Sequence, residues 1–149
     1  MDEQVWPSFW TLGAKWPYGG EIDIIEGINL VSQNQMALHT NSGCIVAPNA
    51  PSRQTGLVLQ TNCSASSDGL TPNVGCTVDE NKPNNYGQGF ANAQGGVWAV
   101  QMDVAGIFIW FWSVGIFSFY LIDGTLMLIL FLYAATRHSS IYKIRHVYI

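Results

Sequence analysis

The chain has 149 residues, which is enough for one small domain. Only 11% of its residues are charged, 13% are aromatic, and the formal net charge is −4. This composition provides no basic surface, so it argues against a protein that binds nucleic acid.

The first residues, Met1-Asp2-Glu3-Gln4, are acidic and polar. A secretory signal peptide needs a basic start followed by an apolar core, and this segment has neither. We therefore expect the chain to begin inside a domain, with Met1 an internal methionine or a misplaced start.

Residues 21–26 read Glu-Ile-Asp-Ile-Ile-Glu, so every position between the three acids is isoleucine. Isoleucine favours an extended, packed strand, and period two puts Glu21 and Asp23 on the same face. Glu26 has the opposite parity and joins them only if the strand contains one extra residue. We predict a β-bulge near Ile24 and Ile25, a feature that often re-aims a side chain beside an active site.

Two glutamates on one face, with an aspartate between them, suit a retaining glycosidase. In such an enzyme one carboxylate attacks the sugar and the other, about 5 Å away, donates a proton to the leaving oxygen. Repulsion between neighbouring acids keeps one of them protonated, and Asp23 is placed to assist. Solvated acids on a half-exposed strand would be the ordinary explanation of an isolated Glu-x-Asp pair.

The sequence around the acids favours the catalytic interpretation. The matching segments include W-P-S-F-W-T-L-G (6–13), W-P-Y-G-G-E (16–21) and N-Q-M-A-L-H-T (34–40), together with residues 43–44, 75–76, 85–87 and 95–99. Over about residues 5 to 112 the chain closely resembles glycoside hydrolase family 16, in particular fungal endo-β-1,3(4)-glucanases of the laminarinase type.

The resemblance implies an all-β, concanavalin-like β-jelly-roll sandwich that binds β-glucan in a concave cleft. It also implies that Glu21 is the nucleophile, Glu26 the acid/base and Asp23 the assisting carboxylate. Family members need nearly twice this length, so we expect an incomplete jelly roll that lacks N-terminal and C-terminal strands. No cofactor is implied, and no cluster suited to calcium is recognisable.

Trp10, Trp16 and His39 match positions that contact sugar in the family. Tryptophan is more often a core residue, and a lone strand histidine is usually structural. Trp10 and Trp16 lie in a Gly- and Pro-rich stretch, where loops deliver side chains to a cleft edge. We expect the other tryptophans to be core or strand residues: Trp6, Trp98, Trp110 and Trp112.

In residues 35–40 the alternation predicts a strand with Met36 and Leu38 facing inward and His39 facing the other way. A metal role for His39 has no support, because no second histidine or cysteine stands at ligand spacing to it.

Residues 41–96 are rich in Asn, Ser, Thr, Gly and Pro and indicate long loops between short strands. Two further strands are predicted at 97–103 and 107–112. Cys44, Cys63 and Cys76 form an odd set, typical of a secreted protein in which one bridge forms and another partner lies outside this sequence.

The resemblance ends near residue 113, which predicts a partial catalytic domain over 1–113 and an unrelated apolar tail over 114–149. One hypothesis makes 114–135 a transmembrane helix followed by a basic tail, but Asp123 would then lie within the membrane. The favoured hypothesis is translated intron or shifted reading frame.

The predicted function is therefore that of a retaining endo-acting hydrolase of β-1,3 or mixed β-1,3(1,4)-glucan, secreted in its intact form. The alternatives are an inactive glucan-binding protein, membrane-tethered or associated with the cell wall, and a transglycosylase that transfers its glycosyl intermediate to another sugar.

Overall fold

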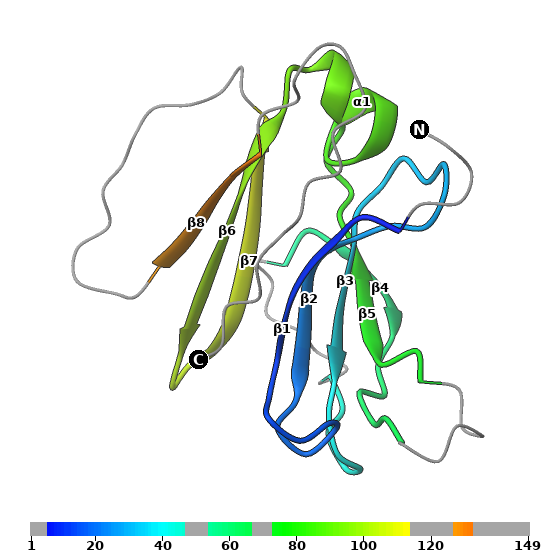
Figure 1. Cartoon of the computed structure of the whole chain (residues 1–149), viewed down its shortest axis with the longest axis vertical. Coiled ribbons are helices and arrows are strands. Elements are labelled where there is room, and N and C mark those ends of the chain that lie inside the picture. Colours follow the sequence, from blue (N-terminus) through cyan, green and yellow to red (C-terminus); the bar gives the residue numbers. More distant parts are fainter. Residues whose placement is uncertain (1–5, 47–53, 67–72, 114–126, 133–149) are drawn as a thin grey trace.

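The structure is a computed structural model that describes residues 6–46, 54–66, 73–113 and 127–132. The first sheet contains β1 (Ser8–Leu12), β2 (Glu21–Glu26), β3 (Gln35–His39), β5 (Cys76–Asp79) and β4 (Leu57–Gln60), in that order. The second contains β7 (Gly106–Ser113), β6 (Gly96–Asp103) and β8 (Met127–Leu132), in that order. Every strand pair is antiparallel. The short helix α1 (Gly87–Asn92) lies between the two sheets in the sequence (Figure 1).

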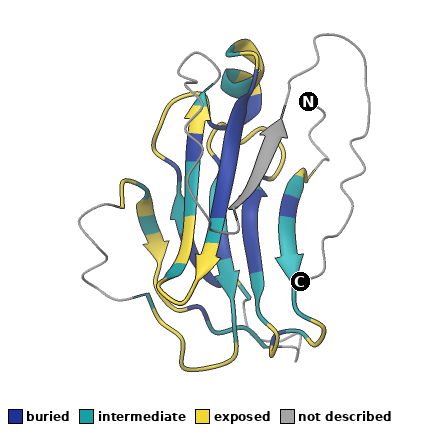
Figure 2. Cartoon of the chain, turned by 90° about the vertical axis from the view of Figure 1, so that its left-hand side faces the viewer, coloured by how far each residue is buried: buried dark blue, intermediate teal, exposed yellow. Residues whose placement is uncertain are grey.

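The predicted strand pair near residues 97–112 is confirmed. Asp103 pairs with Gly106 at its turn, and the register continues without interruption to Gly96 opposite Ser113. Strand β6 is the central strand of the second sheet, and Figure 2 shows that it is buried along most of its length. The all-β prediction is therefore confirmed.

The core lies between the sheets and takes side chains from both. Trp98 packs against Phe111 with ring centroids 4.8 Å apart. Met36 and Leu38 pack against this core, as the alternation in β3 predicted. The buried cluster comprises Phe9, Ile22, Ile24, Ile25, Tyr86, Trp98, Val100 and Phe111.

Strand β7 has two different faces. Phe111 points into the core, whereas Phe108, Trp110 and Trp112 alternate with it and stack along the strand, with neighbouring centroids 5.9 and 6.4 Å apart. Trp98 is thus a core residue, and Trp110 and Trp112 are strand residues, as predicted.

Part of the apolar tail is a strand. Residues Met127–Leu132 pair with β6, from Gln101 opposite Met127 to Gly96 opposite Leu132. The helix hypothesis is therefore wrong for these residues. An apolar run can form its backbone hydrogen bonds with the free edge of a strand as well as within a helix. Among the described residues, no helix is long and apolar enough to cross a membrane. The rest of 114–135, the basic tail and Met1 lie outside the described residues, and the domain boundary at 113 stays a prediction.

The predicted single bridge joins Cys63 to Cys76, and Cys44 is free and exposed. Cys76 belongs to β5, so the bridge ties the connection after β4 to the sheet that carries the acids. The expected second partner for Cys44 stays a prediction.

Replacing Phe111 by alanine should lower the free energy of unfolding by about 3–5 kcal/mol, because the lost ring leaves a cavity between the sheets. Phe108→Ala is the matched control on the same strand: Phe108 is 38% exposed, whereas Phe111 is 1% exposed. The control should cost less than about 1 kcal/mol. Urea denaturation measures both, and equal losses would contradict the assignment of the inner face.

Candidate active site

Strand β2 contains the predicted bulge. Opposite β1, Phe9 pairs with Ile25 and the next residue, Trp10, pairs with Asp23, which leaves Ile24 as the extra residue. Ile24 and Ile25 are both buried in the core. The change of parity places Glu26 on the face of Glu21 and Asp23, because it reverses the alternation between them.

Asp23 lies at the centre of this face and is only 3% exposed. Its cross-strand neighbour on β3 is Ala37, whose small side chain leaves room beside the carboxylate. Glu21 pairs with His39, and His39 Nε2 lies 3.1 Å from Asp23 Oδ2. The sequence-predicted His39 therefore joins the acids through Asp23.

Two indole groups donate to the two glutamates. Trp16 Nε1 donates to Glu21 Oε2 at 2.5 Å, and Trp6 Nε1 donates to Glu26 Oε1 at 2.8 Å. Trp16 therefore lies at the acid row, as expected for a cleft residue, and Trp10 pairs with Asp23 on the same face. The expectation that Trp6 is a core or strand residue is wrong, since Trp6 is 60% exposed and precedes β1.

The pairing of β1 with β2 explains the position of Trp6. Once β1 and β2 are paired as neighbours, Ser8 falls opposite Glu26. Residue 6 then lies just beyond the end of the pair, beside the second glutamate. Composition carries no information about this register, so it could not place Trp6 beside Glu26.

Burial raises the pKa of both Glu21 and Glu26 above the ordinary value of 4.5, and the negative charge of Asp23 raises them further. The indole donors act in the opposite direction, because an N–H group stabilises the ionised carboxylate. Hydrogen bonding to Asp23 raises the pKa of His39 above 6.5, against the effect of burial. These three side chains therefore keep their protons to higher pH than the same groups do in water.

Glu21, Asp23 and His39 are also the described residues that come nearest to a cation site. Their candidate ligand atoms lie within 4.8 Å of one another. Two of these groups already interact directly, since His39 lies against Asp23 and donates a hydrogen bond to it when protonated.

No sequence feature indicated Asn34, which is fully buried at 0% exposure. Its side chain contacts the backbone of Ile24 and Glu26, on either side of Ile25. Polar residues of this kind are rarely buried without partners. The segment 34–40 matched the family, but its first residue gave no local indication of this contact.

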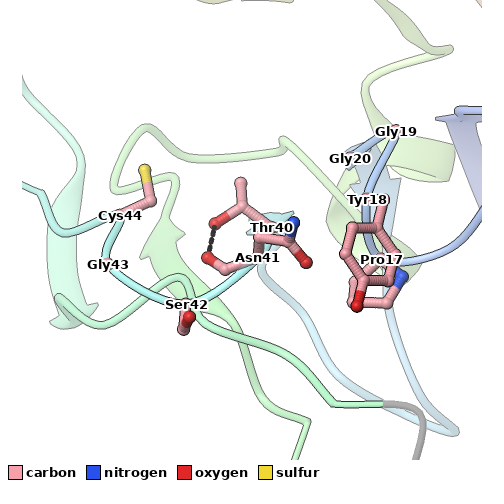
Figure 3. A pocket seen from close by; sticks show the side chains of 9 residues that line it. All are labelled: Pro17, Tyr18, Gly19, Gly20, Thr40, Asn41, Ser42, Gly43 and Cys44. Atoms are coloured by element: carbon pink, nitrogen blue, oxygen red, sulfur yellow. Dashed lines mark hydrogen bonds between the residues drawn. The ribbon is translucent and has the colours of Figure 1, made fainter.

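A surface hollow adjoins the acid row (Figure 3). It is bordered by residues 17–20, which lead into β2, and by residues 40–44, which follow β3. Gly20 directly precedes Glu21, and Thr40 directly follows His39. The hollow therefore lies at the end of the sheet where β2 begins and β3 ends.

Comparisons with known proteins agree with this geometry. The family model described as "XgeA-like, catalytic GH16 domain" matches residues 2–117. An endo-1,3(4)-beta-glucanase of Arthroderma benhamiae is 45% identical over 109 residues, which are 71% of this chain and 23% of that protein. A probable glycosidase of Schizosaccharomyces pombe is 43% identical over 72% of this chain and 25% of its own length.

Among solved structures, an elongating GH family 16 beta-1,3-glucosyltransferase is 39% identical with a TM-score of 0.66, covering 78% of this chain and 37% of that one. The chain belongs to glycoside hydrolase family 16, and its two antiparallel sheets are part of that family's jelly roll. It spans about a quarter of the length of the curated relatives named above.

Trp16→Phe should raise the pKa of Glu21 further, because the variant removes the N–H donor that favours the ionised carboxylate. Trp6→Phe should do the same for Glu26. Carbon-13 NMR titration of the glutamate carboxyls measures both values. Each variant is the control for the other, and a shift of both glutamates in either variant would contradict separate indole contacts.

His39 should make stability depend on pH. Its pKa is raised in the folded state, so its contribution is fully present below the ordinary value of 6.5 and is lost as pH rises through the folded pKa. The difference in unfolding free energy between wild type and His39→Gln should therefore be larger at about pH 5.5 than at about pH 9.

Urea denaturation at the two pH values measures this difference. Asp23→Asn provides the control background, since it removes the carboxylate that binds the imidazole proton. The pH dependence of the His39 effect should shrink there, and an undiminished effect would exclude the Asp23 contact as its cause.

Proposed function

We propose that the chain is part of a retaining endo-acting glycoside hydrolase that cleaves β-1,3 or mixed β-1,3(1,4)-glucan. The observation that carries the proposal is the bulge at Ile24, which brings Glu26 onto the face of Glu21 and Asp23. The reaction needs one ionised and one protonated carboxyl group on the same face, and burial together with the negative charge of Asp23 raises the pKa of Glu26, the proposed acid.

The proposed mechanism has two steps. In the first, the Glu21 carboxylate attacks the anomeric carbon while protonated Glu26 gives its proton to the departing glycosidic oxygen. A covalent glycosyl ester forms and the leaving sugar departs with a new hydroxyl group. In the second, Glu26 takes a proton from water, whose oxygen attacks the anomeric carbon and releases Glu21 with retention of configuration.

The division of roles follows the family pattern, since each glutamate accepts from an indole N–H and lies near the charge of Asp23. The hydrogen bond from Trp16 to Glu21 is the shorter of the two, which supports an ionised nucleophile. Burial and the negative charge of Asp23 raise the pKa of Glu26, which supports a protonated acid. Asp23 therefore assists both roles without contacting the anomeric carbon.

We propose that Trp10, Trp16 and His39 contact the glucan. Trp10 and His39 are cross-strand neighbours of the acids, and Trp16 contacts Glu21 directly. Aromatic rings pack against the apolar faces of pyranoses, and an imidazole bonds to hydroxyl groups. The adjoining hollow gives an extended chain space to continue past Glu21.

Transfer to another sugar is the second candidate activity. One solved relative is named an elongating beta-1,3-glucosyltransferase, and the same covalent intermediate serves hydrolysis and transfer. Product analysis of short β-1,3-glucans separates the two, because transfer makes chains longer than the substrate.

We also propose that the intact protein is secreted. The Cys63–Cys76 bridge supports this, since disulfides persist in oxidising compartments.

Glu21→Gln should lower hydrolysis of a soluble β-1,3-glucan by at least about 10³-fold and leave glucan binding intact, because the amide keeps the shape of the side chain but cannot form the ester. Reducing-end release and affinity electrophoresis measure the two properties. Asp103→Asn, at the end of β6, is the control and should change neither.

Unchanged turnover in Glu21→Gln would refute the nucleophile assignment. Wild-type chain that binds glucan without hydrolysing or transferring it would support the glucan-binding alternative instead.

A further inference from the structure

On the edge that faces β3, the bulge in β2 is paired with a side chain instead of a strand, whereas its other edge pairs with β1. The backbone ladder between β2 and β3 runs from Glu21 opposite His39 to Asp23 opposite Ala37 and does not extend past Asp23. Beyond it, Asn34 Nδ2 donates to the Ile24 carbonyl at 2.9 Å, and Asn34 Oδ1 accepts from the Glu26 N–H at 2.8 Å. A primary amide offers one carbonyl and an N–H donor, so it can replace a peptide group of a neighbouring strand.

Asn34 is itself held rigidly. Its N–H donates to Asn85 Oδ1 at 2.6 Å, and its carbonyl accepts from the Glu80 N–H at 3.0 Å. Asn85 is 1% exposed, and its Nδ2 donates to the carbonyls of Glu80 and Lys82. The backbone of Asn34 therefore has fixed partners in the segment before α1, and these partners hold its side-chain amide in place against the bulge.

The next residue, Tyr86, secures the end of β2 from the other side. Its hydroxyl donates to the Pro7 carbonyl at 3.0 Å and lies 3.4 Å from the Gly27 carbonyl. Burial raises the pKa of Tyr86 to about 12, so the hydroxyl keeps its proton in neutral and acidic solution. Asn34 and Tyr86 thus hold the backbone on both sides of the Glu26 side chain.

We propose that Asn34 is a positioning residue for Glu26, oriented by Asn85, and that it sets the distance from the Glu26 carboxyl to the bond being cleaved. This proposal rests on the acid/base function proposed above for Glu26. The Asn34 side chain hydrogen-bonds to the backbone of β2 and lies fully buried, so it acts through Glu26 and not on the sugar.

Loss of the amide should impair proton transfer more than substrate binding. Without Asn34, the Ile24 carbonyl and the Glu26 N–H lose their partners, and the bulge can relax toward regular strand geometry. A displacement of about 1 Å at a reacting group can cost about 100-fold in rate. The value of kcat should therefore fall while KM changes little.

The test compares Asn34→Ala with a matched control, Asn73→Ala. Asn73 makes the same pair of side-chain bonds to backbone, accepting from the Ser66 N–H and donating to the Ser66 carbonyl, each at 2.7 Å. Its bonds lie in the loop before β5, away from the bulge. Both variants remove an asparagine that bridges backbone, and only one of them affects Glu26.

Two substrates separate proton donation from nucleophilic attack. On a soluble β-1,3-glucan, Asn34→Ala should lower kcat about 10- to 100-fold. On a 2,4-dinitrophenyl glycoside of a β-1,3-gluco-oligosaccharide, the leaving group needs no proton, so the burst of dinitrophenolate should stay within about threefold of wild type. Asn73→Ala should match wild type on both substrates.

Equal losses on the two substrates would show that Asn34 serves the whole fold and would overturn the proposal. No loss on either substrate would also overturn it. Asn85→Ala provides a second variant should Asn34→Ala not fold; it keeps both bulge contacts and should show the same substrate dependence with a smaller loss.

NMR separates this proposal from the proposed function. In the wild-type chain the Glu26 amide should exchange slowly, and in Asn34→Ala it should exchange at least about 10-fold faster, while the amides of Ile22 and Asp23 in the regular ladder change little. If the wild-type chain is inactive but shows this exchange pattern, the catalytic role of Glu26 is refuted and the contact of Asn34 with the bulge, here called the clamp, is confirmed. Unchanged exchange at Glu26 would refute the clamp whatever the activity.

Discussion

The structure of the site depends on one irregularity in hydrogen bonding, the extra residue Ile24 in β2. A regular strand with this sequence would send Glu26 to the opposite face from Glu21, into the apolar space between the sheets. The bulge allows Ile24 and Ile25 to enter the core together while all three acids share the outer face. The same irregularity therefore stabilises the core and assembles the site.

The price of this arrangement is electrostatic, because three carboxylates lie close together and Asp23 is almost completely buried. Neighbouring groups offset the repulsion: an indole N–H contacts each glutamate, and the imidazole of His39 lies against Asp23. Burial still keeps the pKa of both glutamates above the ordinary value. The close, buried carboxylates thus lower the stability of the fold and at the same time allow the site to hold and release protons.

The need for backbone hydrogen bonds also explains why β6 pairs with β8. Strand β6 is buried along most of its length and pairs with β7 on one side, so its other edge needs hydrogen bonds. Residues Met127–Leu132 supply them as β8. An apolar run is compatible with a membrane helix or with a strand, and the available edge decides the outcome for these six residues.

Local sequence determined the acid row and four of the described strands. Alternating and isoleucine-rich segments fixed β2, β3, β6 and β7, and the parity of Glu26 required the bulge, because side-chain direction in a strand follows from residue spacing alone. Only the tertiary structure could place Trp6 beside Glu26 and Asn34 beside Ile24. These contacts join residues 20 and 10 positions apart, and they depend on how β1 and the start of β3 dock against β2.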